Sequence, residues 1–203
     1  MKLAWLEQFY RGLAATSRRY GVPIVGGDVA HHRGGIVATL ALIGESSPSG
    51  VVTRTGARPG DWIFVTGALG NSLRSGHHWK FTPRLAEGQW LARQRGIHAM
   101  IDVSDGLAKD LRTLTPRGAV PALDPGALPL RVGADVRIAL TEGEDYELLF
   151  ALAARTDCAA FVRAWRKKFP RTRLSRIGQF VRPGALPAGA LNLTDYRGFE
   201  HLR

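Results

Sequence analysis

Strand-like and helix-like segments alternate irregularly along this chain, and that order is what most restricts its fold. Amphipathic spacing predicts helices over residues 3–19, 83–95, 107–114 and 158–169, the last one capped by Asp157. Runs of β-branched and aliphatic residues predict strands over residues 23–25, 35–44, 62–66, 98–103, 146–152 and 174–180. The connections are long and unequal, so the pattern favours an α+β layered fold over a regular doubly wound sheet.

Composition excludes several classes of protein. Hydrophobic residues make up 45% and charged residues 22% of the 203 residues, which are ordinary globular values and exclude a disordered chain. No apolar run approaches the roughly 20 residues of a membrane helix, so we expect no membrane span. The first residues carry charge where a signal peptide would be apolar, and Cys158 is the one cysteine. Both observations favour a cytoplasmic location.

The net charge of +11 favours anionic partners. Nucleic acid, acidic surfaces and phosphorylated small molecules all meet that description. The densest basic stretch, residues 163–176, also has aromatic side chains at helical spacing, and we interpret it as an amphipathic helix with a solvated basic face. A nucleic-acid partner is therefore suggested by charge alone, and we do not expect one.

Three acidic clusters lie where a strand is predicted to end and glycine lets a ligand approach the backbone. They are Gly26-Gly27-Asp28, Asp102-Val103-Ser104-Asp105-Gly106 and Gly143-Glu144-Asp145. Alternation along a strand puts Asp102 and Ser104 on one face, while Asp105 opens the following helix. Two such carboxylates could hold Mg²⁺ together with substrate phosphates. The alternative is that Ser104 or Asp105 merely caps that helix.

Familiar phosphate-binding and catalytic motifs are absent from the sequence. Residues 67–72 are rich in glycine but lack the lysine of a Walker loop, and there is no protein-kinase catalytic loop. We interpret the adjacent pair His77-His78 as loop or surface histidines rather than as a metal site. Any phosphate chemistry would then depend on the acidic clusters and on arginine.

Read together and in order, these pieces resemble thiamine-monophosphate kinase, of the superfamily that includes aminoimidazole ribonucleotide synthetase and selenophosphate synthetase. The matching stretches span nearly the whole chain and cover residues 5–9, 25–28, 53–67, 101–107, 143–150 and 198–201. The Gly-Glu-Asp-Tyr-Glu-Leu sequence that begins at Gly143 favours this kinase over its superfamily relatives. The resemblance implies a PurM-like C-terminal domain, a layered α/β sandwich, over residues 51–203. Residues 1–50 would then be the last part of an ATP-binding N-terminal domain.

The resemblance also implies a reaction. ATP would phosphorylate thiamine monophosphate to thiamine diphosphate by in-line transfer with Mg²⁺, and ATP and thiamine monophosphate would be the partners. The attacking group is a phosphate oxygen that is already ionised near neutral pH, so no catalytic nucleophile or strong base is assigned. Positioning two anions that repel each other is the main task, and metal ions with arginine can do it.

Site residues follow from the matched motifs. The resemblance assigns ATP contacts to Gly27, Asp28, Arg54 and Ser104. It assigns metal ligands to Asp28, Asp102 and Asp105. Glu144 and Phe199 would contact the thiamine part of the substrate, where a carboxylate and an aromatic face suit a cationic ring.

The chain also departs from the family pattern. Family members carry roughly one hundred further residues before the first helix, comparable with a small domain, and pair as homodimers through that part. The resemblance therefore predicts a truncated member with impaired activity. The alternative is a non-catalytic protein that binds a nucleotide or a thiamine phosphate.

Overall fold

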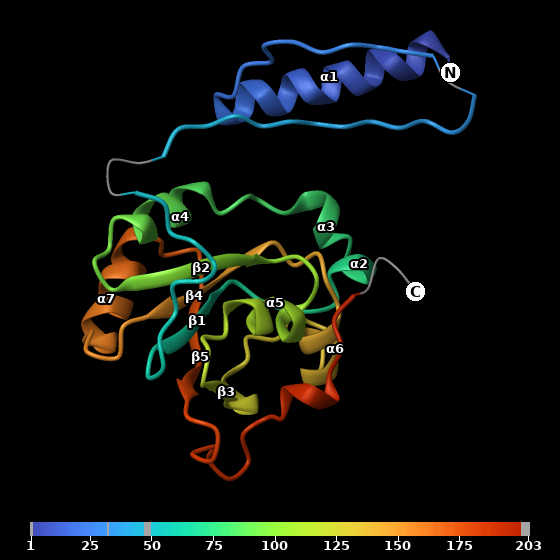
Figure 1. Ribbon diagram of the computed structural model, residues 1–203. Helices are drawn as coiled ribbons and strands as arrows, with labels where there is room; N and C mark the ends of the chain where they lie inside the picture. Colours follow the sequence, from blue (N-terminus) through green and yellow to red (C-terminus); the bar gives the residue numbers. More distant parts are fainter. Residues whose placement is uncertain (1, 32, 47–49, 200–203) are drawn as a thin grey trace. The chain divides into compact units, whose positions relative to one another are not determined.

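The protein is described by a computed structural model that covers residues 2–31, 33–46 and 50–199. The chain divides into two compact units, Met1–Glu45 and Ser46–Arg203 (Figure 1). The predicted domain boundary falls between residues 50 and 51. Residues 47–49, just before it, lie outside the described residues. No helix in the described part of the chain is long and apolar enough to cross a bilayer.

The first unit is built around one long helix, α1 (Leu3–Tyr20), close to the predicted bounds. Trp5 and Phe9 lie one turn apart, and their rings stack with centroids 5.4 Å apart. The helix ends at Gly21, which adopts a φ of 66° and donates its backbone N–H to the carbonyl of Ser17. A left-handed glycine of this kind is a common helix stop, because it has no Cβ to clash.

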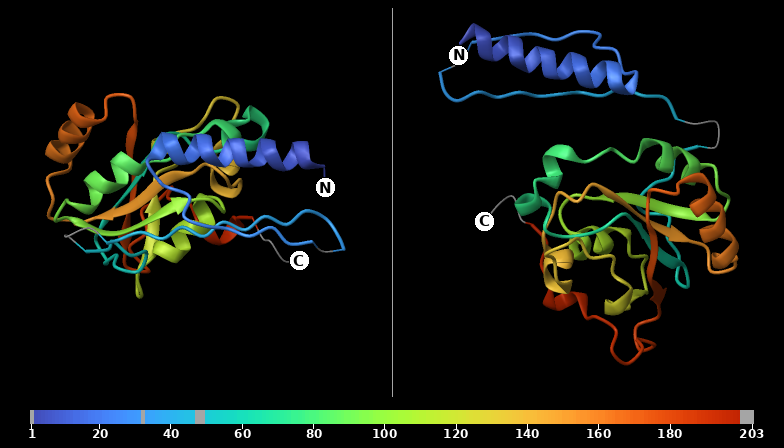
Figure 2. Two further views of the ribbon diagram at one scale, coloured as in Figure 1. Left: turned by 90° about the horizontal axis from the view of Figure 1, so that it is seen from above. Right: turned by 180° about the vertical axis from the view of Figure 1, so that it is seen from behind.

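The strands predicted over residues 23–25 and 35–44 are not present. The described backbone there is extended but is assigned to no strand, as the uncoiled segments of the first unit in Figure 2 show. Val37 and Ile43 keep 77% and 93% of their side-chain surface exposed. An apolar, β-branched run becomes a strand only when a neighbouring strand supplies a ladder of hydrogen bonds, and the described residues of this unit supply none.

The second unit is a five-stranded antiparallel sheet in the order β2-β4-β1-β5-β3. The strands are β1 (Trp62–Thr66), β2 (Ile97–Val103), β3 (Val120–Leu123), β4 (Glu147–Leu152) and β5 (Leu174–Val181). The helices are α2 (Ser72–Ser75), α3 (His77–Lys80), α4 (Leu85–Ala92), α5 (Leu107–Leu114), α6 (Val136–Thr141) and α7 (Cys158–Lys168). Two 3₁₀ turns, Pro125–Ala127 and Leu193–Asp195, complete it.

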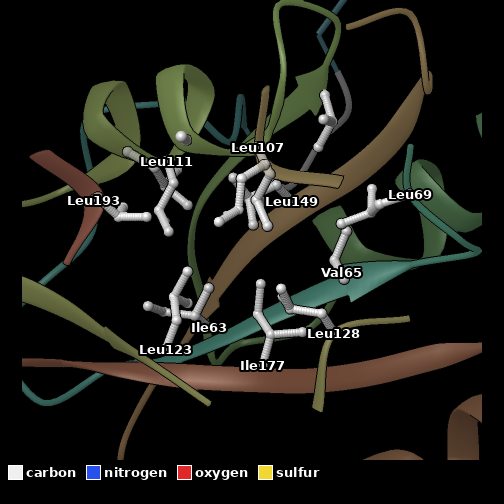
Figure 3. Packing of buried hydrophobic residues seen from close by; sticks show 14 of the residues in the cluster. Ile63, Val65, Leu69, Leu107, Leu111, Leu123, Leu128, Leu149, Ile177 and Leu193 are labelled. Carbon is white, nitrogen blue, oxygen red and sulfur yellow. The ribbon is translucent and has the colours of Figure 1, made fainter. Parts of the chain in front are cut away.

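Helices cover both faces of this sheet. On one face, Leu107 and Leu111 of α5 pack towards Ile63 and Ile177 of the sheet (Figure 3). On the other face, α4 and α7 cover an aromatic core that includes Phe150 and Trp165. The central strand β1 is consequently buried on both sides, which explains why its sequence is continuously apolar rather than alternating.

The pairing of β2 with β4 positions the candidate site. The ladder runs to the pair Val103 and Glu147, the last residue of β2 and the first of β4. Because the two strands are antiparallel, the loop that leaves β2 and the loop that enters β4 meet at the same end of the sheet. These loops hold two of the three acidic clusters.

Candidate functional site

Asp102 lies near the end of β2, and Ser104 and Asp105 follow in the loop that leads into α5. Asp102 is exposed, whereas the next residue, Val103, is fully buried in the core. The chain enters α5 through Gly106, whose φ is 101° and whose added Cβ would lie 3.1 Å from the carbonyl oxygen of Glu142. Glycine is therefore needed at this turn for both its conformation and its size.

The capping alternative for Ser104 and Asp105 is wrong, because α5 has no side-chain N-cap. Instead, Asp110 of α5 itself reaches back, and its Oδ2 accepts the backbone N–H groups of Ser104 and Asp105, each at 3.0 Å. The carboxylate of Asp110 thus fixes the acidic loop, a role that motif matching did not indicate. The available signal was a charged residue within a helix whose neighbouring positions 107, 108, 111 and 114 are all buried.

Burial raises the pKa of Asp110 to about 6, although its two backbone hydrogen bonds lower that pKa. The charges of Asp105 and then Asp102 raise it further. The three carboxylates are thus close enough to repel one another, and one of them is held away from water. Negative charge is concentrated at the start of α5, where it would attract a cation.

The loop before β4 packs directly on this acidic loop. The backbone N–H of Glu144 donates to the carbonyl of Ser104 at 2.8 Å, and that of Tyr146 donates to Val103 at 2.8 Å. A Cβ added to Gly143 would lie 2.3 Å from the same Ser104 oxygen. Glycine is therefore required at position 143, where the backbones of the two loops approach closely. The side chain of Glu144 remains partly exposed beside the loop that follows β2.

Asp145, the last residue of that cluster, points inward and has a structural role. It is fully buried, and its carboxylate accepts from the backbone N–H of Gly70 at 2.8 Å and from Arg131 at 3.1 Å. Burial raises the pKa of Asp145 to about 6, against the opposing effects of these two partners. Asp145 is thus buried within the fold, whereas its neighbour Glu144 remains accessible to a ligand.

Phe199 is brought to the same site by backbone contacts. Its N–H donates to the carbonyl of Asp105 at 2.9 Å, and Lys109 donates to the Phe199 carbonyl at 2.8 Å. Lys109 also pairs with the Asp105 carboxylate at 2.7 Å. A Cβ on Gly198 would lie 2.5 Å from the Asp105 carbonyl, so this contact again requires glycine.

The other predicted ATP contacts are Arg54, Gly27 and Asp28, and they lie outside the three loops described above. Arg54 follows Thr53, whose carbonyl accepts the N–H of Met100 at 3.1 Å beside the edge strand β2, two residues before Asp102. Gly27 and Asp28 lie in the first unit, Met1–Glu45. The structure thus brings together Asp102, Ser104, Asp105, Glu144 and Phe199.

The donor set at the acidic loop suits one kind of metal. Among the residues that the structure describes, no group of three or more His, Cys, Asp and Glu side chains is placed to hold a metal ion. Mg²⁺ commonly takes only one or two carboxylates and completes its shell with water and substrate phosphates. Asp102 and Asp105 fit Mg²⁺ that binds together with a phosphate, and they do not form a closed protein cage.

The close approach at Gly143 leads to a first prediction. We expect Gly143→Ala to lower the free energy of unfolding by about 1–3 kcal/mol, because the new methyl group must push the two loops apart. Gly88→Ala in α4 is the matched control, since its Cβ would meet nothing closer than 3.6 Å. Urea denaturation of both variants measures the difference. Equal stability of the two variants would contradict the close contact.

Comparison with known proteins identifies the family. A family model described as AIR synthase related protein, N-terminal domain, matches residues 2–46. The thiamine-monophosphate kinase of Salmonella typhimurium is 32% identical over an alignment that covers 97% of this chain and 69% of that protein. This chain belongs to the thiamine-monophosphate kinase family. The resemblance stated from the motifs is confirmed, and the family is one of kinases.

The match to these thiamine-monophosphate kinases is partial in length. That of Rhodopirellula baltica is 32% identical, and the alignment covers 84% of this chain and 56% of the relative. The chain thus spans about 56% to 69% of the length of these curated relatives. Activity, substrates and partners of the whole protein are therefore matters for proposal.

Solved structures of thiamine-monophosphate kinases share the fold. The enzyme of Stenotrophomonas maltophilia superposes with a TM-score of 0.55 at 27% identity, covering 65% of this chain and 51% of that one. AaThiL complexed with AMPPCP and TMP superposes with a TM-score of 0.67 at 21% identity, covering 100% of this chain and 70% of that one. These likenesses confirm the predicted α+β, PurM-like fold.

Proposed function

We propose that this chain carries the thiamine-monophosphate kinase reaction, in which ATP phosphorylates thiamine monophosphate to thiamine diphosphate with Mg²⁺. The observation that supports it is the convergence of the loops 102–106, 143–146 and 198–199 on Ser104 and Asp105. The motif in each of these loops independently predicts a metal or substrate contact. AaThiL, complexed with AMPPCP and TMP, supports the same choice of substrates.

The proposed roles are divided among the charged groups. Within the second unit, Arg54 and Ser104 contact ATP, and Glu144 and Phe199 contact the thiamine part. Asp102 and Asp105 hold Mg²⁺, which when bound neutralises charge on the phosphates. In the first unit, Gly27 and Asp28 are assigned to ATP, and Asp28 also to Mg²⁺, from their motif alone. Lys109, which pairs with Asp105, adds a positive charge beside the same carboxylate. A cytoplasmic location and a homodimeric assembly belong to the same proposal.

The main task of the protein in this reaction is to position the two reacting anions. The substrate phosphate oxygen is the nucleophile and is already ionised, so the protein needs no general base. What it must supply is electrostatic neutralisation and alignment of two anions, and removal of one such contact commonly costs about 10²–10³ in rate. We therefore assign no catalytic nucleophile among these residues.

The test measures ADP release that depends on thiamine monophosphate and Mg²⁺. We expect Asp102→Asn to lower turnover by about 10²-fold. Asp157→Asn is the control, because Asp157 caps α7 with an exposed side chain and asparagine caps equally well. If turnover of Asp102→Asn equals that of the control, the metal assignment is wrong. Mg²⁺-dependent binding of ATP without any ADP release would instead support the non-catalytic alternative.

A further inference from the structure

A stacked aromatic pair lies next to Glu144 and has no role in the fold or function described so far. The rings of Phe81 and Tyr146 are parallel to within 22°, and their centroids are 4.2 Å apart. Phe81 directly follows α3, whereas Tyr146 directly precedes β4, so the tertiary fold brings the two rings together. Both residues retain part of their surface exposed, unlike Phe150 and Trp165 of the core beneath α4 and α7.

The backbone that presents Tyr146 is strained. Tyr146 has a φ of 52° and Glu144 a φ of 63°, and both are large side chains in the left-handed region. Each such residue costs about 1–3 kcal/mol and persists only where surrounding contacts enforce it. Here the enforcing contacts are the N–H bonds to Val103 and Ser104. The strain turns the Tyr146 ring and the Glu144 carboxylate out of the regular strand geometry that begins at Glu147.

Tyr146 lies close to two acidic side chains that have proposed roles at the site, Glu144 and Asp102. Burial is the main cause that raises the pKa of its phenol, and the negative charges of Glu144 and Asp102 raise that pKa further. The ring is thus within electrostatic reach of a proposed substrate contact and a proposed metal ligand. An electron-rich ring flanked by carboxylates is an environment that favours a cation.

His77 lies beside Phe81 and carries no positive charge that would repel a cation. Its Nε2 lies 3.2 Å from the carbonyl oxygen of Asp145, and its ring centroid lies 6.4 Å from that of Phe81. Burial first, and then the charge of Arg131, lower the pKa of His77, so the imidazole is neutral near neutral pH. His77 therefore supports Phe81 and adds no positive charge.

We propose that Phe81 and Tyr146 are specificity-determining residues, which form an aromatic wall against which the cationic heteroaromatic part of the substrate packs beside Glu144. The identity of that ligand rests on the proposed function, and the wall itself rests on the ring geometry. The wall selects for a flat, positively charged ring, because stacking and the cation–π attraction act together there. Because the wall has no assigned ATP contact, we expect Mg²⁺–ATP to be recognised independently of it.

The experiment measures binding of thiamine monophosphate and of Mg²⁺–ATP by calorimetry to the 203-residue chain. We expect Phe81→Leu and Tyr146→Leu to weaken thiamine monophosphate by about fivefold to thirtyfold and to leave Mg²⁺–ATP within about twofold. Tyr146→Phe keeps the ring and should bind as the parent does. Trp79→Ala is the matched control, since Trp79 lies in the same segment but is 82% exposed.

The outcomes separate this inference from the proposed function. If Glu144→Gln weakens thiamine monophosphate and Phe81→Leu does not, the aromatic wall is wrong and the proposed function stands. If the parent chain binds neither thiamine nor thiamine monophosphate, both fail. Intermolecular NOEs, assigned to Phe81 and Tyr146 by comparison with the spectra of Phe81→Leu and Tyr146→Leu, test the wall directly, because the protons of these two rings should contact the thiazolium or pyrimidine protons. A ligand that binds without any such contact would overturn the proposal.

Discussion

Replacement of Arg84 by methionine is expected to lower the free energy of unfolding by about 3–5 kcal/mol. Arg84 holds both oxygens of Glu147, with its Nε and Nη2 each donating at 2.7 Å, and Thr66 donates to the same carboxylate at 2.6 Å. The Glu147 side chain is only 2% exposed. Removal of the guanidinium would leave a buried carboxylate without its cation.

Urea denaturation followed by fluorescence measures this effect, because the fully buried Trp165 reports on the second unit. The control is Arg166→Met in α7, which lies in the same unit as Trp165 and is exposed, and which should change the free energy of unfolding by less than about 0.5 kcal/mol. The double variant Arg84→Met/Glu147→Met should recover part of the loss, since no unpaired charge remains. A similar cost for the two arginine variants would contradict the role of burial.

Elements with strong local signals could be predicted from the sequence. The strand β1 and the helix α5 have the predicted bounds, and Asp157 caps α7 by accepting the backbone N–H groups of Ala159 and Ala160. The strand β3 has a weak signal in the sequence, because Pro121 cannot donate a ladder hydrogen bond and so disfavours a central strand. β3 in fact lies at the edge of the sheet, where proline is tolerated. The helix α6, with six residues, is too short to show a period.

The candidate site shows the same division between local and non-local information. The motifs predict which loops would carry ligand groups, because glycine beside acidic residues at strand ends is visible in sequence. They could not indicate that Asp145 turns inward while Glu144 stays accessible, since that depends on the left-handed backbone of Glu144. Nor could they identify Phe81, which meets Tyr146 only through the tertiary fold.

Asp110 provides the sharpest test of how the acidic loop is held. We expect Asp110→Ala to lower the free energy of unfolding by about 2–4 kcal/mol, because two backbone N–H groups lose a buried, charged acceptor. Asp135→Ala is the control: Asp135 is an exposed cap that accepts from Ile138 at 2.7 Å, and its loss should cost about 1 kcal/mol. Urea denaturation again gives both values.

The same variant separates stability from ligand binding. Asp110→Asn removes the negative charge but retains one oxygen, and a single oxygen, Oδ2, accepts both N–H groups in the parent, so this variant should keep more of the stability than Asp110→Ala. In conditions where both variants remain folded, Mg²⁺–ATP binding should weaken in the order parent, Asp110→Asn, Asp110→Ala, because the loop that carries Ser104 and Asp105 becomes progressively less fixed. If the two variants bind Mg²⁺–ATP as tightly as the parent, the position of this loop does not determine nucleotide binding, and Asp110 acts only on the stability of the fold.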